Sequence, residues 1–308
     1  MITAENLTKV YGKRTALDNV SFEVPEGEIF GFVGPNGAGK TTTLRILAAL
    51  LEPTSGHASV GGADVAKHPD KVHSSIGYMP DFFGVYDQLT VAEYLDFYAA
   101  CYRQPKQRRV KIIHDLLDLI GLTERRDQAV DTLSRGLKQR LCLARALVHD
   151  PVVLMLDEPA SGLDPRARVE MREILRELRR MGKTIIISSH ILPELTELCT
   201  MIGIIDHGRM RATGTVHDVI QQLSADRRVR ITVVGDKEAA LLILRPHAAV
   251  RQVDIANGTI EATYEGDEST AAEILQALTA GGIKVSAFNQ VDGGLEEAFM
   301  RATSEEVG

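Results

Sequence analysis

The pattern of hydrophobic and polar residues predicts strands that alternate with helices over most of the chain. Short apolar runs bounded by turn residues are typical of strands, and they occur at residues 2–10, 19–24, 29–33, 76–79, 152–156, 184–188 and 201–205. Apolar residues at helical spacing between these runs predict helices over 44–51 and 169–181. This alternation predicts an α/β fold with a mostly parallel sheet covered on both faces.

From about residue 89 to 150 the strand pattern gives way to helical periodicity. Apolar residues there recur every three or four positions, as in Val110, Ile113, Leu116, Leu117 and Ile120. That spacing places them on one face of a helix. We therefore expect a helical insertion over residues 89–150 within the α/β domain.

Near the carboxy terminus a different order of elements is predicted. Two strands at 250–255 and 259–264 flank an Asn257-Gly258 pair, which is a strong signal for a hairpin turn. The other elements of this region are strands or helices at 229–234, 237–244, 271–278 and 284–289. The resulting β-α-β-β-α-β order is the ferredoxin-like arrangement, an α+β fold. A last helix is expected at 295–302.

The distribution of charge predicts a domain boundary before this region. The chain has a net charge of −7, and residues 226–308 hold 8 Lys and Arg against 14 Asp and Glu. Most of the excess negative charge therefore lies in the tail, and we expect domains at 1–225 and 226–308. The acidic balance weighs against nucleic acid as the main partner.

Composition and cysteine content predict a globular protein of the cytoplasm. Hydrophobic residues make up 44% of the chain and charged residues 25%, as in ordinary globular proteins. No apolar run approaches the roughly 18 residues of a membrane-spanning helix, and the amino terminus lacks a secretory pattern. We expect the chain to reach a membrane only through a partner. The separated cysteines Cys101, Cys142 and Cys199 predict buried, reduced thiols rather than a disulfide or zinc site.

A glycine-rich segment follows the predicted strand 29–33 and opens the predicted helix. Glycines allow successive backbone N–H groups to point at phosphate oxygens, and the helix adds its positive end. Lys40 is suited to bridge the outer phosphates, and the Thr41 hydroxyl to bind Mg²⁺. The segment matches the phosphate-loop spacing G-x-x-x-x-G-K-[ST], with Gly34, Pro35, Asn36, Gly37, Ala38, Gly39, Lys40, Thr41 and Thr42. We predict that these residues bind a nucleoside triphosphate.

Two adjacent acids, Asp157 and Glu158, follow the apolar run 152–156. Asp157 is expected to hold Mg²⁺, and Glu158 to be the general base that polarises the attacking water. Adjacent acids at a strand end are often only exposed carboxylates, but a phosphate loop requires a metal-binding acid on a neighbouring strand. The pair therefore predicts hydrolysis of the bound triphosphate.

Four further features accompany these motifs in a fixed order. Tyr11 lies upstream of the loop, residues 133–137 read LSRGL, residues 160–164 read ASGLD, and His190 follows the strand 184–188. They resemble, in turn, the adenine-stacking aromatic, the signature LSGGQ, the D-loop and the switch histidine of the nucleotide-binding subunits of ABC transporters. The resemblance covers about residues 1–220. It implies a P-loop NTPase fold and an ATPase that uses ATP and Mg²⁺, with Glu158, His190 and Lys40 as catalytic residues.

The signature segment also has a physical interpretation. Ser134 is a good N-cap, so Ser134 and Gly136 would present a hydroxyl, an N–H group and a helix amino end to an anion. In the ABC family that anion is the γ-phosphate held by the opposite subunit. The resemblance thus implies a head-to-tail homodimer that closes on two ATP molecules and opens after hydrolysis.

Three positions depart from the family pattern. Arg135 replaces the first of the signature's two glycines, and Leu137 replaces its final Gln. Asp81 stands where the family has the Gln of its Q-loop. An Asp side chain is shorter and charged, and we expect Asp81 to reach Mg²⁺ directly or through water.

Aromatic residues after Asp81 predict where a partner docks. Phe82, Phe83 and Tyr86 lie in a glycine-containing loop, and exposed aromatics of this kind suit a groove for a short helix of a membrane partner. Tyr94 and Phe97 are expected in the core of the helical insertion instead. This loop, the signature and the tail are most similar to the ABC-2 type export group, which implies a separate transmembrane permease and a peripheral position on the cytoplasmic face of the membrane.

Other functions stay open at this stage. Importer subunits also exist with tail domains. Soluble ABC ATPases that act on nucleic acid or ribosomes usually carry two ATPase halves or a long coiled coil, whereas this sequence has one phosphate loop and no sustained heptads. A regulatory module that only senses ATP would have no need of Glu158 and His190.

Overall fold

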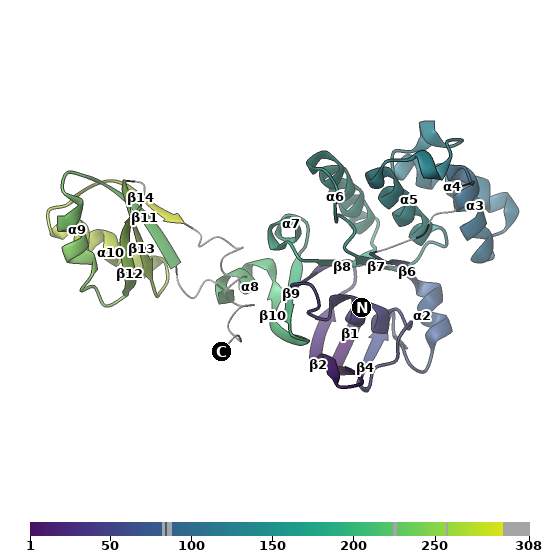
Figure 1. Cartoon of the computed structure of the whole chain (residues 1–308), viewed down its shortest axis with the longest axis horizontal. Coiled ribbons are helices and arrows are strands. Elements are labelled where there is room, and N and C mark those ends of the chain that lie inside the picture. The colour runs from purple at the N-terminus through teal and green to yellow at the C-terminus, as the bar shows by residue number, and fades with distance from the viewer. Residues whose placement is uncertain (82–83, 85–87, 224–226, 257, 292–308) are drawn as a thin grey trace. The chain divides into compact units, whose positions relative to one another are not determined.

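The computed structural model describes residues 1–81, 84, 88–223, 227–256 and 258–291, drawn in Figure 1. The chain divides into two compact units, Met1–Val216 and His217–Gly308. Each unit has its own sheets and its own hydrophobic core. Residues 217–223 thus belong to the second unit, whereas charge placed the boundary after residue 225. The exact domain boundary stays a prediction.

A six-stranded sheet lies at the centre of the first unit. Its order is β10-β9-β3-β8-β7-β6, and all neighbouring strands are parallel except β9 and β10. Every residue of β3, β7 and β8 is buried, as expected for a parallel sheet covered on both faces. The strands are β3 (Ile29–Val33), β6 (Ile76–Met79), β7 (Val153–Asp157), β8 (Thr184–Ser189), β9 (Met201–Asp206) and β10 (Arg209–Thr215). The predicted α/β sheet is confirmed.

An antiparallel sheet lies on one side of the central sheet, opposite the helices α5 (Arg135–Leu147) and α6 (Pro165–Arg180) (Figure 1). Its order is β2-β1-β4-β5, with β1 (Ile2–Tyr11), β2 (Arg14–Val24), β4 (Ser55–Val60) and β5 (Ala63–Asp64). The helix α1 (Lys40–Leu47) contributes its buried face to the core between the two sheets. In that core the Phe22 ring stacks on Phe30 with 5.2 Å between centroids and packs on Phe32 at 5.4 Å. These contacts hold β3, the strand from which the phosphate loop begins.

Side-chain caps begin the helices α3 (Val91–Cys101), α5 and α6 of the first unit. Thr90 and Glu93 form a capping box, in which the Thr90 backbone N–H donates to Glu93 Oε2 at 2.8 Å. Ser134 caps α5 and Asp164 caps α6 with their side-chain oxygens. The helices are α2 (Pro69–Ser75), α3 (Val91–Cys101), α4 (Lys106–Leu119), α5 (Arg135–Leu147), α6 (Pro165–Arg180) and α7 (Leu192–Thr196), with single 3₁₀ turns at Thr123–Arg125 and Val130–Thr132. Of these, α3, α4 and α5 fill the predicted helical insertion.

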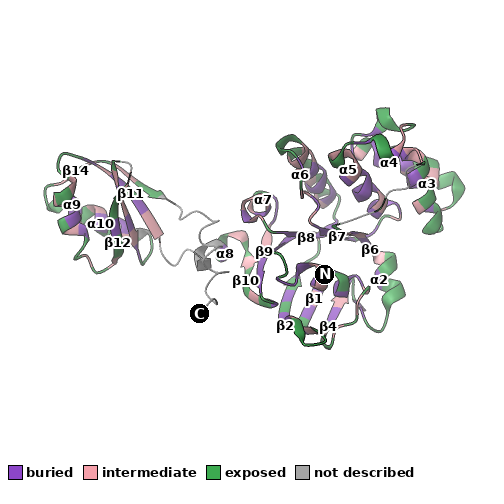
Figure 2. Cartoon of the chain, viewed as in Figure 1, coloured by how far each residue is buried: buried purple, intermediate pink, exposed green. Residues whose placement is uncertain are grey.

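One aromatic side chain of the insertion is more exposed than expected. Tyr94 is buried, as predicted, but Phe97 is 43% exposed. Phe97 lies two residues from both Leu95 and Ala99, which are buried, so it points to the opposite side of α3. The expectation that Phe97 belongs to the core was therefore wrong. Figure 2 shows the exposed side of this helix.

The cysteines are all free thiols. Cys142 and Cys199 are buried, as expected, but Cys101 is exposed. Cys101 is the last residue of α3, where the helix leaves the core. The expectation of buried thiols therefore holds for two of the three and was wrong for Cys101.

The second unit contains a four-stranded antiparallel sheet of order β12-β13-β11-β14. Side chains of β11, β13, α9 and α10 form its core. The elements are β11 (Arg227–Val234), α9 (Lys237–Leu244), β12 (Val250–Ala256), β13 (Thr259–Tyr264), α10 (Glu268–Ala280) and β14 (Lys284–Val291). This confirms the predicted ferredoxin-like order. Gly258 has the positive φ, +79°, that the predicted hairpin turn needs, while Asn257 and the predicted helix 295–302 lie outside the described residues.

The sequence pattern did not predict β4, β5, α2, β10 or the helix α8 (Val216–Leu223). These elements are short or carry mixed polar and apolar residues, so their periodicity is weak. None of the helices in the described ranges is long and apolar enough to cross a bilayer.

Candidate functional site

The glycine-rich loop joins the end of β3 to the start of α1, and its shape requires glycine. Gly39 has φ of +114°, and a Cβ atom there would lie 2.6 Å from Leu17 Cδ2 and 2.9 Å from the Ala16 carbonyl oxygen. A Cβ atom on Gly34 would fall within 3.0 Å of the carbonyl oxygen of Ile205. Both contacts are too short for any side chain. The loop therefore lies close against neighbouring backbone, and only glycine fits at these two positions.

Lys40 is the first residue of α1 and is buried, with 6% of its side chain exposed. Its Nζ donates to the carbonyl oxygens of Gly34 at 2.6 Å and Pro35 at 3.2 Å. The same Nζ lies 3.3 Å from Glu158 Oε1. A buried ammonium group needs such partners, because removing it from water without them is costly.

Two adjacent acids lie at the end of β7, Asp157 as its last residue and Glu158 directly after it. Ser188 of β8 forms a hydrogen bond with each of them. The Ser188 hydroxyl donates to Asp157 Oδ1 at 2.5 Å and accepts from the Glu158 backbone N–H at 2.9 Å. Glu158 has φ of +51°, a conformation that a non-glycine residue adopts at a cost of about 1–3 kcal/mol and that is frequent at functional sites. The sharp turn points the Asp157 and Glu158 carboxylates in different directions.

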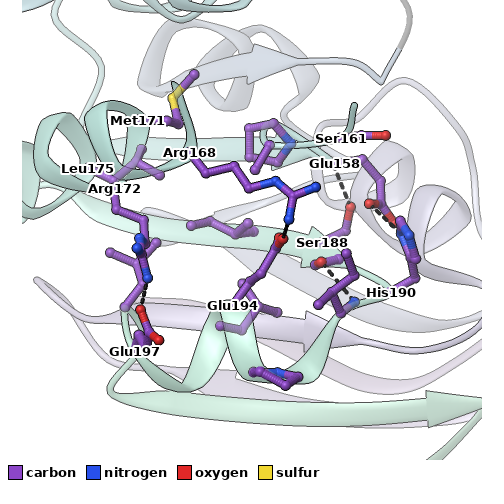
Figure 3. Close-up of a pocket in the computed structure, with 18 of the residues that line it drawn as sticks. Glu158, Ser161, Arg168, Met171, Arg172, Leu175, Ser188, His190, Glu194 and Glu197 are labelled. Atoms are coloured by element: carbon purple, nitrogen blue, oxygen red, sulfur yellow. Dashed lines mark hydrogen bonds and ion pairs between the residues drawn. The ribbon is translucent and has the colours of Figure 1, made fainter. Parts of the chain in front are cut away.

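His190 follows β8 and contacts the second oxygen of Glu158. Its Nδ1 lies 2.9 Å from Glu158 Oε2, as Figure 3 shows. The imidazole is 43% exposed, whereas Glu158 is only 13% exposed. Glu158 thus contacts a lysine through one oxygen and a histidine through the other. The structure brings these three predicted catalytic residues together.

A pocket of about 360 Å³ lies over the phosphate loop, within the size range of small-molecule sites. Tyr11, Asp81 and Glu158 line it from distant parts of the first unit's sequence. The other lining residues are Arg14, Ala16, Pro35, Asn36, Gly37, Gly39, Lys40, Thr41 and Thr42. The predicted adenine-stacking residue, most phosphate-loop residues and two of the three predicted metal-binding residues, Thr41 and Asp81, therefore share one pocket. Asp157, by contrast, is buried and is not among the described residues that line it.

The signature residues lie elsewhere. Ser134 is exposed at the start of α5, where its hydroxyl accepts from the Leu137 N–H at 3.4 Å. Neither Ser134 nor Gly136 is among the described residues that line the phosphate-loop pocket. Within one chain, the structure does not bring the signature to the phosphate loop.

A second cavity, of about 410 Å³, lies behind Glu158 and His190 between α6 and α7 (Figure 3). Arg168 spans it, donating to the Leu163 carbonyl oxygen at 3.0 Å and to Glu194 Oε1 at 2.5 Å. Arg168 therefore links the D-loop segment to the helix that follows His190. The remaining wall is mostly apolar.

Two residues of the site were not found by sequence reasoning. Ser188 orients both acids, and Arg14 lines the pocket with a terminal nitrogen 3.4 Å from where a Gly37 Cβ would lie. A serine at the end of an apolar strand beside the acids was an available signal for Ser188. No motif marks Arg14, because its place depends on the pairing of β1 with β2.

Known protein families match both units of the chain. Residues 17–161 match the ABC transporter family. Residues 214–303 match the C-terminal domain of the DrrA1-3-like ATP-binding proteins. The two matches correspond to the nucleotide site and to the ferredoxin-like tail.

Relatives of similar length carry both parts. The linearmycin resistance ATP-binding protein LnrL of Bacillus subtilis is 36% identical over 305 residues, which is 98% of each chain. The Nod factor export ATP-binding protein I of Ralstonia nicotianae is 33% identical over 308 residues, covering 100% of this chain and 95% of the relative.

Solved structures resemble the first unit. One, described as the ATP-binding subunit of an ABC transporter, is 31% identical with a TM-score of 0.65 and covers 72% of this chain and 92% of its own. Another, an ATP-binding cassette in a dimeric post-hydrolysis state bound to ADP and Pi, is 25% identical with a TM-score of 0.64. It covers 70% of this chain and 99% of its own.

Proposed function

The chain belongs to the ATP-binding proteins of ABC transporters, and on that basis we propose that it energises export through a separate membrane permease by ATP-driven dimerisation. The contacts of Glu158 with Lys40 at 3.3 Å and with His190 at 2.9 Å carry the proposal. They join a phosphate-binding cation, a carboxylate and an imidazole at one pocket. A protein that only senses ATP has no use for this arrangement.

Each side chain has a distinct proposed role in hydrolysis. The loop N–H groups and Lys40 bind the phosphates and stabilise the charge that develops on them. Glu158 accepts a proton from the attacking water as general base. His190 orients the Glu158 carboxylate and contacts the γ-phosphate side of the site. Tyr11 stacks on the adenine ring at the outer end of the pocket.

The site also fits Mg²⁺. Asp157 Oδ2 is buried and has no hydrogen-bond partner among the described residues, and an unpaired buried carboxylate oxygen is costly unless a cation completes it. Carboxylate and hydroxyl oxygens are the ligands that Mg²⁺ prefers. Asp157 and Thr41 would hold the ion, with Asp81 at the pocket wall as a further ligand directly or through water. When bound, Mg²⁺ neutralises charge on the outer phosphates.

Dimerisation is supported by the separation of the signature from the phosphate loop. Ser134 is exposed, and its hydroxyl caps the amino end of α5 by accepting from the Leu137 N–H. A second copy of the chain in head-to-tail orientation would bring Ser134 and Gly136 to the γ-phosphate of ATP on the first copy. Each ATP would then be bound by both subunits, and hydrolysis would release them.

A groove between the central sheet and the helical insertion supports docking of a permease. It has a volume of about 360 Å³. Arg145 lies over the Tyr98 ring at 5.1 Å, and Tyr102 stacks on His149 at 3.7 Å. The lining is Ala48, Leu50, His73, Ile76, Tyr78, Tyr98, Tyr102, Arg145 and Ala146. Its mixture of aromatic and apolar side chains suits a short amphipathic helix.

One side chain of the groove, Tyr78, is influenced by the charge of Asp157 at the nucleotide site. Burial, and then the negative charge of Asp157, raise the pKa of Tyr78, which lies on β6 next to β7. A helix bound in the groove would therefore contact Tyr78, a side chain whose pKa depends on the charge of the proposed metal-binding acid. Phe82, Phe83 and Tyr86, which the sequence assigned to docking, lie outside the described residues.

The direction of transport is proposed from the relatives. One is named for resistance to linearmycin and the other for export of Nod factor, and both are similar over nearly the whole chain. We assign the same direction, export, to this chain, with a position on the cytoplasmic face of the membrane through the permease. The ferredoxin-like tail is proposed to serve dimerisation or regulation.

Co-purification with the permease encoded by a neighbouring gene tests the proposal. Leu50→Glu places a charge in the groove, and Val110→Glu is its control, because Val110 is 63% exposed on α4 and does not line the groove. We expect Leu50→Glu to lose the permease and Val110→Glu to retain it, with basal ATP turnover unchanged in both. If the wild-type chain captures no membrane protein, a soluble ATPase is favoured instead.

A further inference from the structure

The signature helix α5 and the D-loop, residues 160–164, contact each other within one chain. Gln139 is buried, and its Nε2 donates to the Ser161 carbonyl oxygen at 3.2 Å. One turn earlier, Gly136 also faces the D-loop, because a Cβ atom there would lie in van der Waals contact with Leu163 Cδ2, at 3.5 Å. The Ser161 N–H in turn donates to the Glu158 carbonyl oxygen at 3.0 Å. The position of the D-loop therefore bears directly on the backbone of the general base.

Arg135 makes the closest of these contacts. A Cβ atom built on Gly162 would fall within 3.0 Å of the Arg135 guanidinium carbon and of both its terminal nitrogens. Gly162 has φ of +68°, so only glycine is both unstrained and small enough at this position. Glycine at 162 and arginine at 135 are thus matched to each other.

Ion pairing does not explain the position of Arg135. Over the described ranges of the chain, Arg135 forms no ion pair and no side-chain hydrogen bond. Its planar guanidinium lies against the Gly162 backbone instead, as arginine does on flat groups more readily than lysine. The contact is therefore a packing contact, which depends on the planar guanidinium of Arg135 and on the lack of a side chain at Gly162.

We propose that Arg135 is a positioning residue that holds the D-loop against the signature helix. The inference rests on the proposed function, because it matters only if the signature meets the ATP of a second subunit. Movement of α5 on contact with that ATP would reach the D-loop through Arg135 and reach Glu158 through the Ser161 N–H. The glycine of the usual signature has no side chain that could do this. Arg135, a departure from the family pattern, thereby adds a link between the two active sites.

A double-mutant cycle on the full-length chain tests this contact. The variants are Arg135→Ala, Gly162→Ala and both together, measured for kcat, KM for MgATP, Hill coefficient and thermal midpoint. We expect Arg135→Ala to lower kcat about 10-fold, because small misplacements of catalytic groups cost this much or more. KM should stay within about twofold, since the phosphate loop is untouched. The Hill coefficient should fall towards one, which a merely structural loss of stability would not cause.

Gly162→Ala gives the sharper outcome. Its Cβ displaces the guanidinium in the wild-type chain, so kcat should fall about 10-fold, but in the Arg135→Ala background it should fall less than about twofold. Gly182→Ala is the matched control, because Gly182 has φ of +85° and nothing within 4 Å of its Cβ position. Gly182→Ala introduces the same kind of backbone strain as Gly162→Ala but no steric clash with a neighbouring side chain, so its kcat should equal that of the wild type.

Independent effects of the two substitutions would overturn the proposal, as would wild-type kcat and Hill coefficient in Arg135→Ala. The thermal midpoints of the same cycle keep the test separate from the proposed function. If the wild-type chain showed no dimer-dependent turnover, the proposed function would fail, yet non-additive midpoints would still support the contact of Arg135 with Gly162. Additive midpoints would reject that contact whatever the kinetics show.

Discussion

Lys40 of the phosphate loop and Glu158 at the end of β7 form an ion pair, with Nζ 3.3 Å from Oε1. Both side chains are largely buried, with exposures of 6% and 13%. The opposite charges of the proposed phosphate-binding cation and the proposed general base therefore offset each other in this ion pair. Under the proposed function, the phosphates of ATP would compete with Glu158 for Lys40, and binding of ATP would free the carboxylate for a water molecule.

Substitution Glu158→Gln should abolish turnover while ATP still binds. Loss of a general base lowers kcat by about 10²- to 10⁴-fold, whereas Gln carries no charge to hold Lys40 away from phosphate. ATP affinity should therefore be preserved or rise. Steady-state hydrolysis and equilibrium binding of ATP measure the two effects. Glu177→Gln, which is exposed on α6, is the control, and wild-type turnover in Glu158→Gln would remove Glu158 from the mechanism.

Substitution Ser188→Ala should lower both activity and stability. It leaves the Glu158 N–H and one more oxygen of Asp157 without their partner, and Ser188 is fully buried. An unpaired buried polar group costs about 1–3 kcal/mol of unfolding free energy. We expect kcat to fall about 10-fold as the two acids lose their orientation. Chemical denaturation and ATPase assays measure this.

The matched control is Ser286→Ala in the tail. Its hydroxyl donates a hydrogen bond as well, to the backbone carbonyl oxygen of Thr232 at 3.1 Å, but Ser286 is exposed. Both kcat and the free energy of unfolding of Ser286→Ala should stay near those of the wild type. Equal losses of kcat and of unfolding free energy in the two serine variants would mean that Ser188 does not orient the two acids.

Substitution Ser134→Arg should separate ATP binding from dimerisation. Ser134 is exposed and does not line the phosphate-loop pocket, so the monomer should bind ATP with nearly wild-type affinity. A large side chain at this helix start would block the γ-phosphate of a second subunit. In a Glu158→Gln background, light scattering should show an ATP-dependent dimer that Ser134→Arg does not form. Dimers of unchanged stability would contradict the head-to-tail arrangement.

Thiol labelling should distinguish the three cysteines. Burial raises the pKa of Cys142 to about 11 and raises that of Cys199 as well, so at pH 8 only about one Cys142 in a thousand is a thiolate. Cys101 is exposed. A thiol reagent should therefore modify Cys101 rapidly in the folded chain and all three in denaturant, as mass spectrometry can count. Because the thiolate reacts, Cys142 labelling should increase with pH up to its raised pKa; rapid labelling of Cys142 at pH 8 would contradict its burial.

The parts of the site that follow one strand could be predicted because their geometry is local. The loop from Gly34 to Thr42 depends on glycine conformations and a helix start within consecutive residues. Asp157 and Glu158 likewise follow directly from an apolar strand. The tail was predictable for a similar reason, since strand and helix periods and one hairpin signal specify the order of its elements.

Contacts between distant segments were not predictable. Ser188 and Asp157 are partners only because β7 and β8 pair in a register that sets Asp157 beside Ser188. Phe97 and Cys101 were assigned to the core because they are apolar, but the direction of α3 relative to the rest of the insertion decides which face is buried.

The sequence by itself determined the nucleotide chemistry, the parallel sheet and the order of the tail, because short-range periodicity and consecutive motif residues encode them. The tertiary structure decided how Lys40, Glu158 and His190 meet, and that Arg135 lies on Gly162. Those contacts join residues far apart in the chain, and they depend on strand register and helix packing that no local pattern records.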